Sequence, residues 1–344
     1  MKKNFYLFAI FMLFLTAFVF TSCSQYDRDV SVSEEAWIRM PDENSSPYVT
    51  KVFDYIAAPG QFTNCLPTCK KGEPKDSVIA RCEKVLVGPE NGGLITLGGF
   101  GGYIIVGFDH TIQNVAGKRD FRVKGNTFWN NSSNKDADSM SGSSEPGIIE
   151  VSSDINMNGE PDDTWYEIAG SEYKKSESVK NYEITFCKPE TRPDGAEVKD
   201  IKWKEYIKWI DNQKNTGYRP KNGCKKQPCF PLWVERDTVT FKGHLLPKNG
   251  KKESADNWVL SSFAYGYADN APNDNDVSAI DIDWAVKEDG TKANLHGVDF
   301  IRVYNGENQE CGWLGETSTE ISGFVDLHLT EENIETVEAI DTEK

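Results

Sequence analysis

Histidine is scarce in this 344-residue sequence: only four occur, at positions 110, 244, 296 and 328, and no two are neighbours. The sequence also lacks a His-Glu-x-x-His pair, a Gly-x-Ser-x-Gly turn and a Gly-Lys-Ser/Thr loop. These absences argue against a zinc peptidase, a serine hydrolase of the α/β type and a P-loop nucleotide-binding protein. Each histidine is therefore interpreted as a structural or surface residue.

Basic residues are outnumbered by acidic ones. The 38 Lys and Arg against 54 Asp and Glu give a net charge of −16, and removal of a leader whose only charges are Lys2 and Lys3 would leave −18. A surface this acidic repels nucleic-acid phosphates and anionic membranes, which argues against nucleic-acid binding. Hydrophobic residues at 38% and aromatic residues at 12% are ordinary globular values, so the chain can bury one large core or two modest ones.

Only the N-terminus carries a long apolar run. The segment Phe5–Phe20 follows two lysines and ends at small residues just before Cys23. This order is typical of a secretory signal, and a cysteine after small residues resembles a bacterial lipobox. The sequence predicts a lipoprotein signal peptide at residues 1–22 and lipidation of Cys23, whose acyl chains would tether a protein that lies outside the membrane. An ordinary secretory cleavage site is the alternative.

The lipid anchor gives a direct prediction. Cys23→Ala should release the protein from membranes or leave the precursor uncleaved, because acylation and processing depend on that thiol. Membrane fractionation combined with N-terminal sequencing measures both outcomes. A variant that stays in the membrane fraction with a fully processed N-terminus would contradict the lipoprotein interpretation.

Seven cysteines remain after Cys23, and four of them form two close pairs. Cys65 and Cys69 are separated by three residues, and Cys224 and Cys229 by four. Structural zinc sites use more regular C-x₂-C or C-x-x-H spacing, so local disulfides are favoured over zinc half-sites. Because seven is odd, at least one thiol is unpaired or intermolecular.

The body of the chain predicts an all-β sandwich with long loop insertions and little helix. A flexible acidic tether is expected at residues 23–46, the β-sandwich ligand-binding domain at 47–328 and an acidic tail at 329–344, with a split near residue 190 as the alternative. Only Asp200–Asn215 and Thr330–Lys344 are weakly helical in pattern. The expected strands are short β-rich runs between Gly, Asn, Asp and Pro clusters: Leu94–Leu97, Tyr103–Phe108, Gly147–Ser152, Tyr182–Phe186, Asp237–Phe241, Ala279–Asp283 and Val298–Tyr304.

The glycine-rich segment Gly92–Gly107 is not interpreted as a nucleotide loop. A phosphate cradle needs a helix after the glycines, whereas β-branched strand residues follow here. The glycines instead predict a tight hairpin and close backbone packing.

One loop has the pattern of a calcium site. Its oxygen side chains recur at alternate positions, and Gly159 permits the sharp turn that lets them face one centre. Trp165 stands where an EF-hand has its bidentate Glu, so the loop is closer to the shorter calcium loops of extracellular proteins. The sequence predicts a structural calcium ion, with a metal-free Asx-rich turn as the alternative. The predicted ligands are Asp154, Asn156, Asn158, the Glu160 carbonyl, Asp162 and Asp163, with Glu167 as an alternative last ligand.

Aromatic residues near loops and strand ends are the candidates for ligand contact, since a ring face can stack on a sugar or a macrocycle. Core packing is the alternative for most of them. No catalytic residue is assigned, because a carboxylate pair suited to glycoside hydrolysis leaves no local signature. The candidate ligand-binding residues are Trp129, Trp209, Trp233, Trp258, Tyr267 and Asn270.

Several strings resemble a family of Bacteroidota cell-surface lipoproteins of the lectin-like or PKD type. They are Leu97–Asp109, Asp120–Phe128, Ser144–Ser152, Asp162–Glu167 and Gly266–Asn270. The resemblance covers about residues 48–305 and fades across 188–257. It implies a jelly-roll-like sandwich, a lipid-anchored place in the outer membrane facing the exterior, and a neighbouring importer, in some members one for vitamin B12 (cobalamin).

The expected function is therefore a non-catalytic surface lipoprotein that binds a nutrient for an outer-membrane importer. Cobalamin is the first ligand expected, and it follows from the resemblance alone. A carbohydrate-binding surface protein is the alternative, followed by a glycoside hydrolase and by a purely structural envelope protein.

Overall fold

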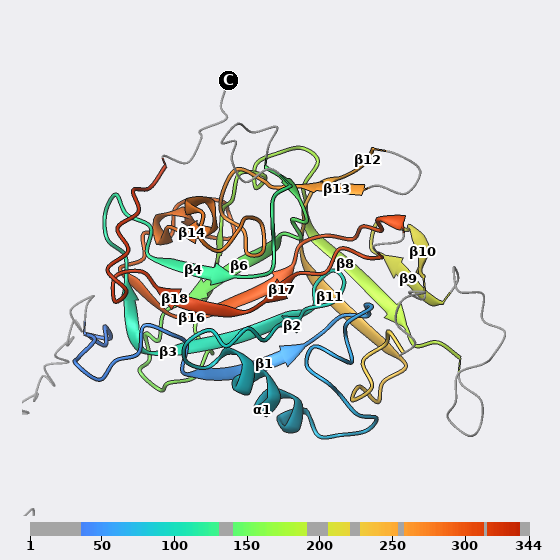
Figure 1. Cartoon of the computed structure of the whole chain (residues 1–344), viewed down its shortest axis with the longest axis horizontal. Coiled ribbons are helices and arrows are strands. Elements are labelled where there is room, and N and C mark those ends of the chain that lie inside the picture. The colour runs from blue at the N-terminus through green and yellow to red at the C-terminus, as the bar shows by residue number, and fades with distance from the viewer. Residues whose placement is uncertain are drawn as a thin grey trace, which may run out of the picture. The chain divides into compact units, whose positions relative to one another are not determined.

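The computed structural model describes residues 36–130, 140–190, 206–220, 228–253, 258–312 and 315–337 (Figure 1). Residues Trp37–Lys344 form one compact unit, which contains both sides of residue 190. The predicted signal peptide, Cys23, most of the tether and the end of the tail lie outside the described residues. Among the described helices, none combines the length and the apolar character needed to cross a membrane.

The prediction of an all-β, sandwich-like fold is confirmed, while jelly-roll connectivity stays a prediction. The largest sheet has six strands, in the order β1 (Lys51–Ile56), β3 (Tyr103–Gln113), β16 (Gly297–Asn305), β6 (Gly147–Ser152), β7 (Trp165–Ile168) and β15 (Ala285–Val286). The second sheet has four, in the order β10 (Thr216–Arg219), β9 (Ile207–Asp211), β8 (Val179–Cys187) and β11 (Thr238–Leu245).

Three smaller sheets complete the described strands. They are β12 (Gly250–Lys252), β13 (Trp258–Ser261) and β5 (Ser141–Gly142); β14 (Ala279–Ile280), β4 (Phe121–Lys124) and β18 (Gly323–Asp326); and the pair β17 (Glu320–Ile321) and β2 (Ile95–Thr96). Two 3₁₀ segments, η3 (Asp276–Ser278) and η4 (Ile282–Trp284), flank β14 and β15. Every pairing between strands is antiparallel.

The two faces of the six-stranded sheet have different chemistry. Alternate residues of a strand point to opposite faces, so each strand contributes to both. One face supplies fully buried aliphatic residues to the main core, among them Ile104, Val106, Ile149, Val151, Ile301 and Val303. Burial of each such side chain stabilises the fold by about 1.5–3 kcal/mol. The opposite face of the same strands carries Glu150 and Arg302, and this face builds the site described below.

The one α-helix among the described residues, α1 (Lys75–Leu86), was not predicted. Its buried residues Val78, Cys82 and Leu86 follow the spacing of one helical face, and Pro74 precedes its first turn. The weak helix expected over 200–215 is wrong in its described part, because residues 207–211 form β9. The described tail, residues 330–337, contains turns and an isolated bridge but no helix.

The glycine-rich segment packs closely against neighbouring backbone, as predicted, but it is not a hairpin. β2 pairs with β17, whereas β3 pairs with β1 and β16. A Cβ atom at Gly102 would collide with the Leu97 carbonyl and the Ala58 amide. The absence of a side chain therefore lets three backbone segments meet at that point.

The predicted disulfide between Cys65 and Cys69 is not present, because Cys69 is a buried free thiol. Its Sγ donates a hydrogen bond to the Pro67 carbonyl at 3.2 Å, and burial raises the pKa of the thiol to about 12. Cys69 packs in the same core cluster as Cys82 of α1, whereas Cys65 is only half-buried. Cys224 lies outside the described residues, so the second predicted pair stays a prediction.

Candidate functional site

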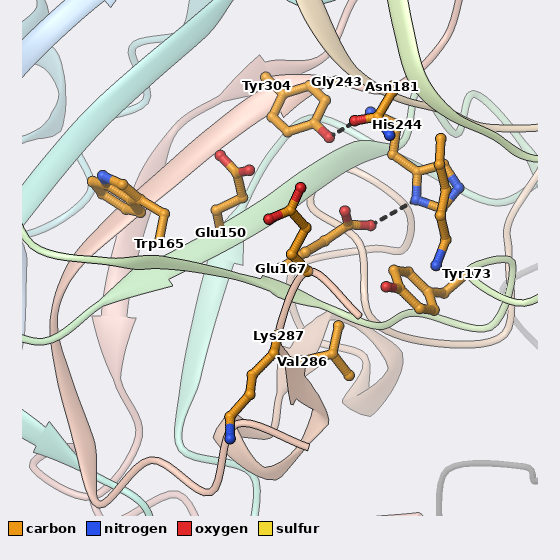
Figure 2. Close-up of a pocket in the computed structure, with 12 residues that line it drawn as sticks. Glu150, Trp165, Glu167, Tyr173, Asn181, Gly243, His244, Val286, Lys287 and Tyr304 are labelled. Carbon is orange, nitrogen blue, oxygen red and sulfur yellow. Dashed lines mark hydrogen bonds and ion pairs between the residues drawn. The ribbon is translucent and has the colours of Figure 1, made fainter. Parts of the chain in front are cut away.

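A pocket of about 310 Å³ lies where β11 crosses the polar face of the six-stranded sheet (Figure 2). Its walls come from strands that are far apart in the sequence and from the segment after β15. The lining residues are Glu150, Trp165, Glu167, Tyr173, Lys180, Asn181, Gly243, His244, Val286, Lys287, Glu288 and Tyr304.

A row of three charged residues crosses the sheet beneath this pocket. Glu167 of β7 lies directly opposite Glu150 of β6, and Glu150 lies directly opposite Arg302 of β16. The Arg302 Nη1 atom is 2.9 Å from Glu150 Oε2, so the two form an ion pair. Two like charges placed directly opposite each other in an antiparallel sheet are destabilising. The repulsion between Glu150 and Glu167 therefore lowers the stability of the fold. A neutral residue at either position would remove that repulsion.

His244 of β11 lies over Glu167. Its Nδ1 atom is 2.9 Å from Glu167 Oε1, and its backbone N–H donates to the Tyr304 hydroxyl at 2.9 Å. Gly243 permits this approach, because a Cβ atom there would press into the Tyr304 ring. The His244 side chain is 3% exposed, and its Nε2 atom has no partner among the described residues. A buried ring nitrogen without a partner indicates a missing hydrogen-bonding group, such as a ligand or a water molecule.

Two aromatic rings flank the carboxylates. Figure 2 shows Trp165 and Tyr173 on opposite sides of Glu150 and Glu167. The Tyr173 ring packs edge-on against His244, with centroids 5.3 Å apart, and the Lys180 ammonium lies 3.9 Å from the Tyr173 centroid. Trp165 is half-buried and offers apolar surface beside hydrogen-bonding groups, the mixture found in small-molecule sites, whereas Tyr173 is buried against His244 and Lys180.

Burial raises the pKa of Glu150. The Arg302 guanidinium opposes that shift and the neighbouring Glu167 adds to it. Burial, followed by the charges of Glu167 and Glu150, also raises the pKa of Tyr304 well above its ordinary value. Tyr304 therefore stays a neutral hydroxyl, and its O–H remains a donor beside the carboxylates.

A second pocket, of about 300 Å³, has a mainly apolar wall beside the four-stranded sheet. Phe230, Pro231, Leu232 and Val234 form most of that wall, and Lys71 and Lys188 lie at its edge. It has no facing pair of carboxylates, so the first pocket is the candidate site.

Three of the predicted ligand-binding residues are buried and cannot present a face to a ligand. Trp233 is 7% exposed and stacks on Tyr55, with ring centroids 5.9 Å apart. Tyr267 is 2% exposed, and its hydroxyl accepts from the Glu172 N–H at 2.9 Å. Asn270 is fully buried and bonds the backbone N–H and C=O of Phe263. These three residues pack within the fold: the Trp233 ring stacks on Tyr55, and the polar atoms of Tyr267 and Asn270 bond other segments.

The other three candidates are half-buried but do not line the pocket. Trp129 donates from Nε1 to Ser262 Oγ at 2.7 Å, Trp209 lies on β9, and Trp258 begins β13. Trp129 bridges to Gly142 of β5, in the same small sheet as β13, whereas Trp209 belongs to the four-stranded sheet, so the three do not form one platform. A ligand contact at any one of them stays a prediction.

The predicted calcium loop connects β6 to β7 and is a compact turn. Asp154 is 3% exposed and accepts from the N–H groups of Asn158 and Gly159, each at 3.0 Å. The side-chain amides of Asn156 and Asn158 donate to the Asp162 carboxylate at 2.9 Å and 3.0 Å, which lowers the pKa of Asp162. An amide has an oxygen on its other arm, so rotation of both Asn side chains would offer oxygens to an ion. Calcium binding stays a prediction.

Calcium is expected to raise the melting temperature, because an ion bound only by the folded loop stabilises it by mass action. Asp154→Ala should abolish the difference between melting curves in calcium and in chelator. Asp289→Ala is the control, since Asp289 forms a similar Asx turn with Thr291 outside the loop. Curves for the unaltered protein that coincide in calcium and in chelator would contradict the site.

Among the described residues, one group of three carboxylates lies within metal-binding distance. Ligand oxygens of Glu145, Asp269 and Glu320 lie within 4.8 Å of one another. The Asp269 oxygens already have protein donors, because they accept from the N–H groups of Thr127 and Glu320 at 3.0 and 2.9 Å. Burial raises the pKa of Glu320 to about 8, and the Asp269 charge adds to the shift. Shared protons and backbone donors thus account for this cluster without a metal.

Comparison with protein-family models finds no match, and comparison with curated proteins finds none either.

Proposed function

We propose that the protein belongs to the class of all-β, ligand-binding surface lipoproteins, and that its ligand is a carbohydrate held in the Glu150–Glu167 pocket. The observation that carries the proposal is the presence in one pocket of two facing, partly buried carboxylates and the half-buried ring of Trp165. Carboxylates accept hydrogen bonds from sugar hydroxyls. A ring such as Trp165 packs against the apolar face of a pyranose.

The pocket volume favours a small ligand. Its value of about 310 Å³ is at the lower end of the range of about 300–1,000 Å³ that binds drug-sized molecules. A sugar unit fits such a volume, whereas cobalamin, with its corrin ring and nucleotide arm, would have to lie mostly outside it. Cobalamin binding for an outer-membrane importer remains the proposal that the family resemblance supports.

The signal-like leader supports the rest of the proposal. Phe5–Phe20, Cys23 and the polar segment after it would place the pocket at a distance from an outer membrane. A protein held in this way would collect its ligand at the cell surface for a neighbouring importer.

Calorimetry on residues 24–344 is the test, with a panel of mono- and disaccharides and with cyanocobalamin. Trp165→Ala should weaken sugar binding at least tenfold, because the stacking face is lost. Phe128→Ala is the control, an exposed aromatic residue that does not line the pocket. Absence of binding to every sugar would refute the carbohydrate proposal. Cyanocobalamin binding that survives Trp165→Ala would point to a different face.

A further inference from the structure

The facing glutamates repel each other, although each has a partner of its own. Their side chains are each about 20% exposed, so solvent screens the repulsion only in part. Arg302 compensates Glu150 and His244 contacts Glu167, but neither partner needs the second carboxylate to be satisfied. Structures retain strained or costly arrangements most often at functional sites.

We propose that Glu150 and Glu167 are a catalytic pair that hydrolyses a glycosidic bond in the carbohydrate held by the pocket. The inference rests on the proposed carbohydrate binding and extends it to a reaction. Glu150, which lies between Glu167 and Arg302 on the sheet, is the proton donor. Glu167, whose carboxylate is oriented by His244, is the nucleophile that attacks the anomeric carbon.

The strand register sets the separation of the Cβ atoms of Glu150 and Glu167. Directly opposite residues of an antiparallel pair have Cβ atoms about 4.5–5.5 Å apart. Glycosidases that retain the anomeric configuration hold their two carboxyl groups about 5–5.5 Å apart, whereas inverting enzymes leave room for a water molecule between more distant groups. Two glutamates that start from directly opposite Cβ atoms can bring their carboxyl groups to the shorter of these separations, so the reaction proposed is hydrolysis with retention.

The reaction balances without any group beyond water. Glu150 gives its proton to the glycosidic oxygen as the bond from that oxygen to the anomeric carbon breaks, and a Glu167 oxygen forms an ester bond to the same carbon. Water then attacks this carbon, Glu150 takes a proton from the water, and the ester bond breaks. The products are two sugars with free hydroxyl groups, and both carboxyl groups return to their starting states.

His244 and Arg302 are positioning residues in this scheme. The His244 Nδ1–Glu167 Oε1 contact fixes one carboxylate, and the Arg302–Glu150 ion pair fixes the other. Tyr304, whose hydroxyl lies beside them as a neutral donor, completes the polar wall.

The test uses the mature protein and a set of 4-nitrophenyl α- and β-glycosides of common hexoses, pentoses and N-acetylhexosamines. Release of nitrophenol is expected for at least one of them. Glu150→Gln should lower kcat about 10³-fold, within the range for loss of a proton-transferring group. Glu167→Gln should lower kcat at least as much, because the nucleophile is lost. Glu167→Ala with added azide should yield the glycosyl azide of inverted anomeric configuration, because azide attacks once from the side that Glu167 occupies. Glu183→Gln is the control, a half-buried glutamate of β8 that pairs with Lys242 and does not line the pocket.

The outcomes separate the two proposals. Sugar binding without turnover of any glycoside overturns the catalytic pair and leaves carbohydrate binding in place. Absence of both binding and turnover overturns both proposals. Turnover that persists in Glu150→Gln and Glu167→Gln overturns the assignment of these residues.

Discussion

Gly102→Ala is expected to lower the free energy of unfolding by about 3 kcal/mol, as an overpacked core position does. The new methyl group would meet the Leu97 carbonyl and the Ala58 amide, which are themselves joined by a 2.9 Å hydrogen bond. The backbone at Gly102 cannot move away easily, because its carbonyl accepts from the Asn305 N–H at 3.0 Å. Urea denaturation measures the loss.

Gly323→Ala is the matched control for that substitution. Gly323 lies in β18, has no positive φ, and has no atom within 4 Å of the position where a Cβ would stand. Its replacement should leave the free energy of unfolding within about 0.5 kcal/mol of the original value. Equal losses in the two variants would contradict the close packing of the glycine-rich segment.

Glu320→Gln is expected to stabilise the protein at pH 7 by up to about 3 kcal/mol. Burial raises the pKa of Glu320 from 4.5 to about 8, so the folded state holds a proton that the unfolded state releases at neutral pH. A pH of 7 is well above the ordinary pKa, and each pKa unit corresponds to about 1.4 kcal/mol. A glutamine keeps the neutral form at every pH.

The pH dependence identifies the cause of that effect. A raised carboxyl pKa contributes stability below pH 4.5, and that contribution is lost as pH rises toward about 8. Glu145 and Asp269 face Glu320, and burial raises the pKa of Asp269 to about 6. Subtracting the stability curve of the variant from that of the original protein, measured between pH 4 and 9, isolates the Glu320 contribution. A difference that does not change with pH would show that Glu320 titrates normally.

The strands were largely predictable from sequence, because alternation of apolar and polar residues indicates a half-buried strand. The predicted run Gly147–Ser152 is β6 without change, and Val298–Tyr304 lies within β16. Helix α1 was missed although Val78, Cys82 and Leu86 recur every four residues, a signal available in the sequence. Buried aromatic residues such as Trp233 were harder to classify, since their burial depends on partners distant in the sequence.

The site could not be assembled from sequence, for a physical reason. Glu150 and Glu167 face each other through strand register, and His244 arrives from another sheet, so no spacing along the chain encodes their contact. One local sign exists: Glu150 is a charged residue between the buried residues Ile149 and Val151. Such a residue points away from the core and marks the outer face of its strand.

The loop of residues 153–164 has a role that does not depend on what it binds. It is the covalent connection between β6 and β7, and it closes directly on the facing residues Ser152 and Trp165. A slip of one residue in this pairing would turn Glu167 toward the aliphatic core and Tyr166 toward the pocket. The Asp154 carboxylate accepts hydrogen bonds from backbone N–H groups of the loop and so holds its conformation. A change in loop length would therefore shift the register of β6 and β7 and change which side chains face solvent.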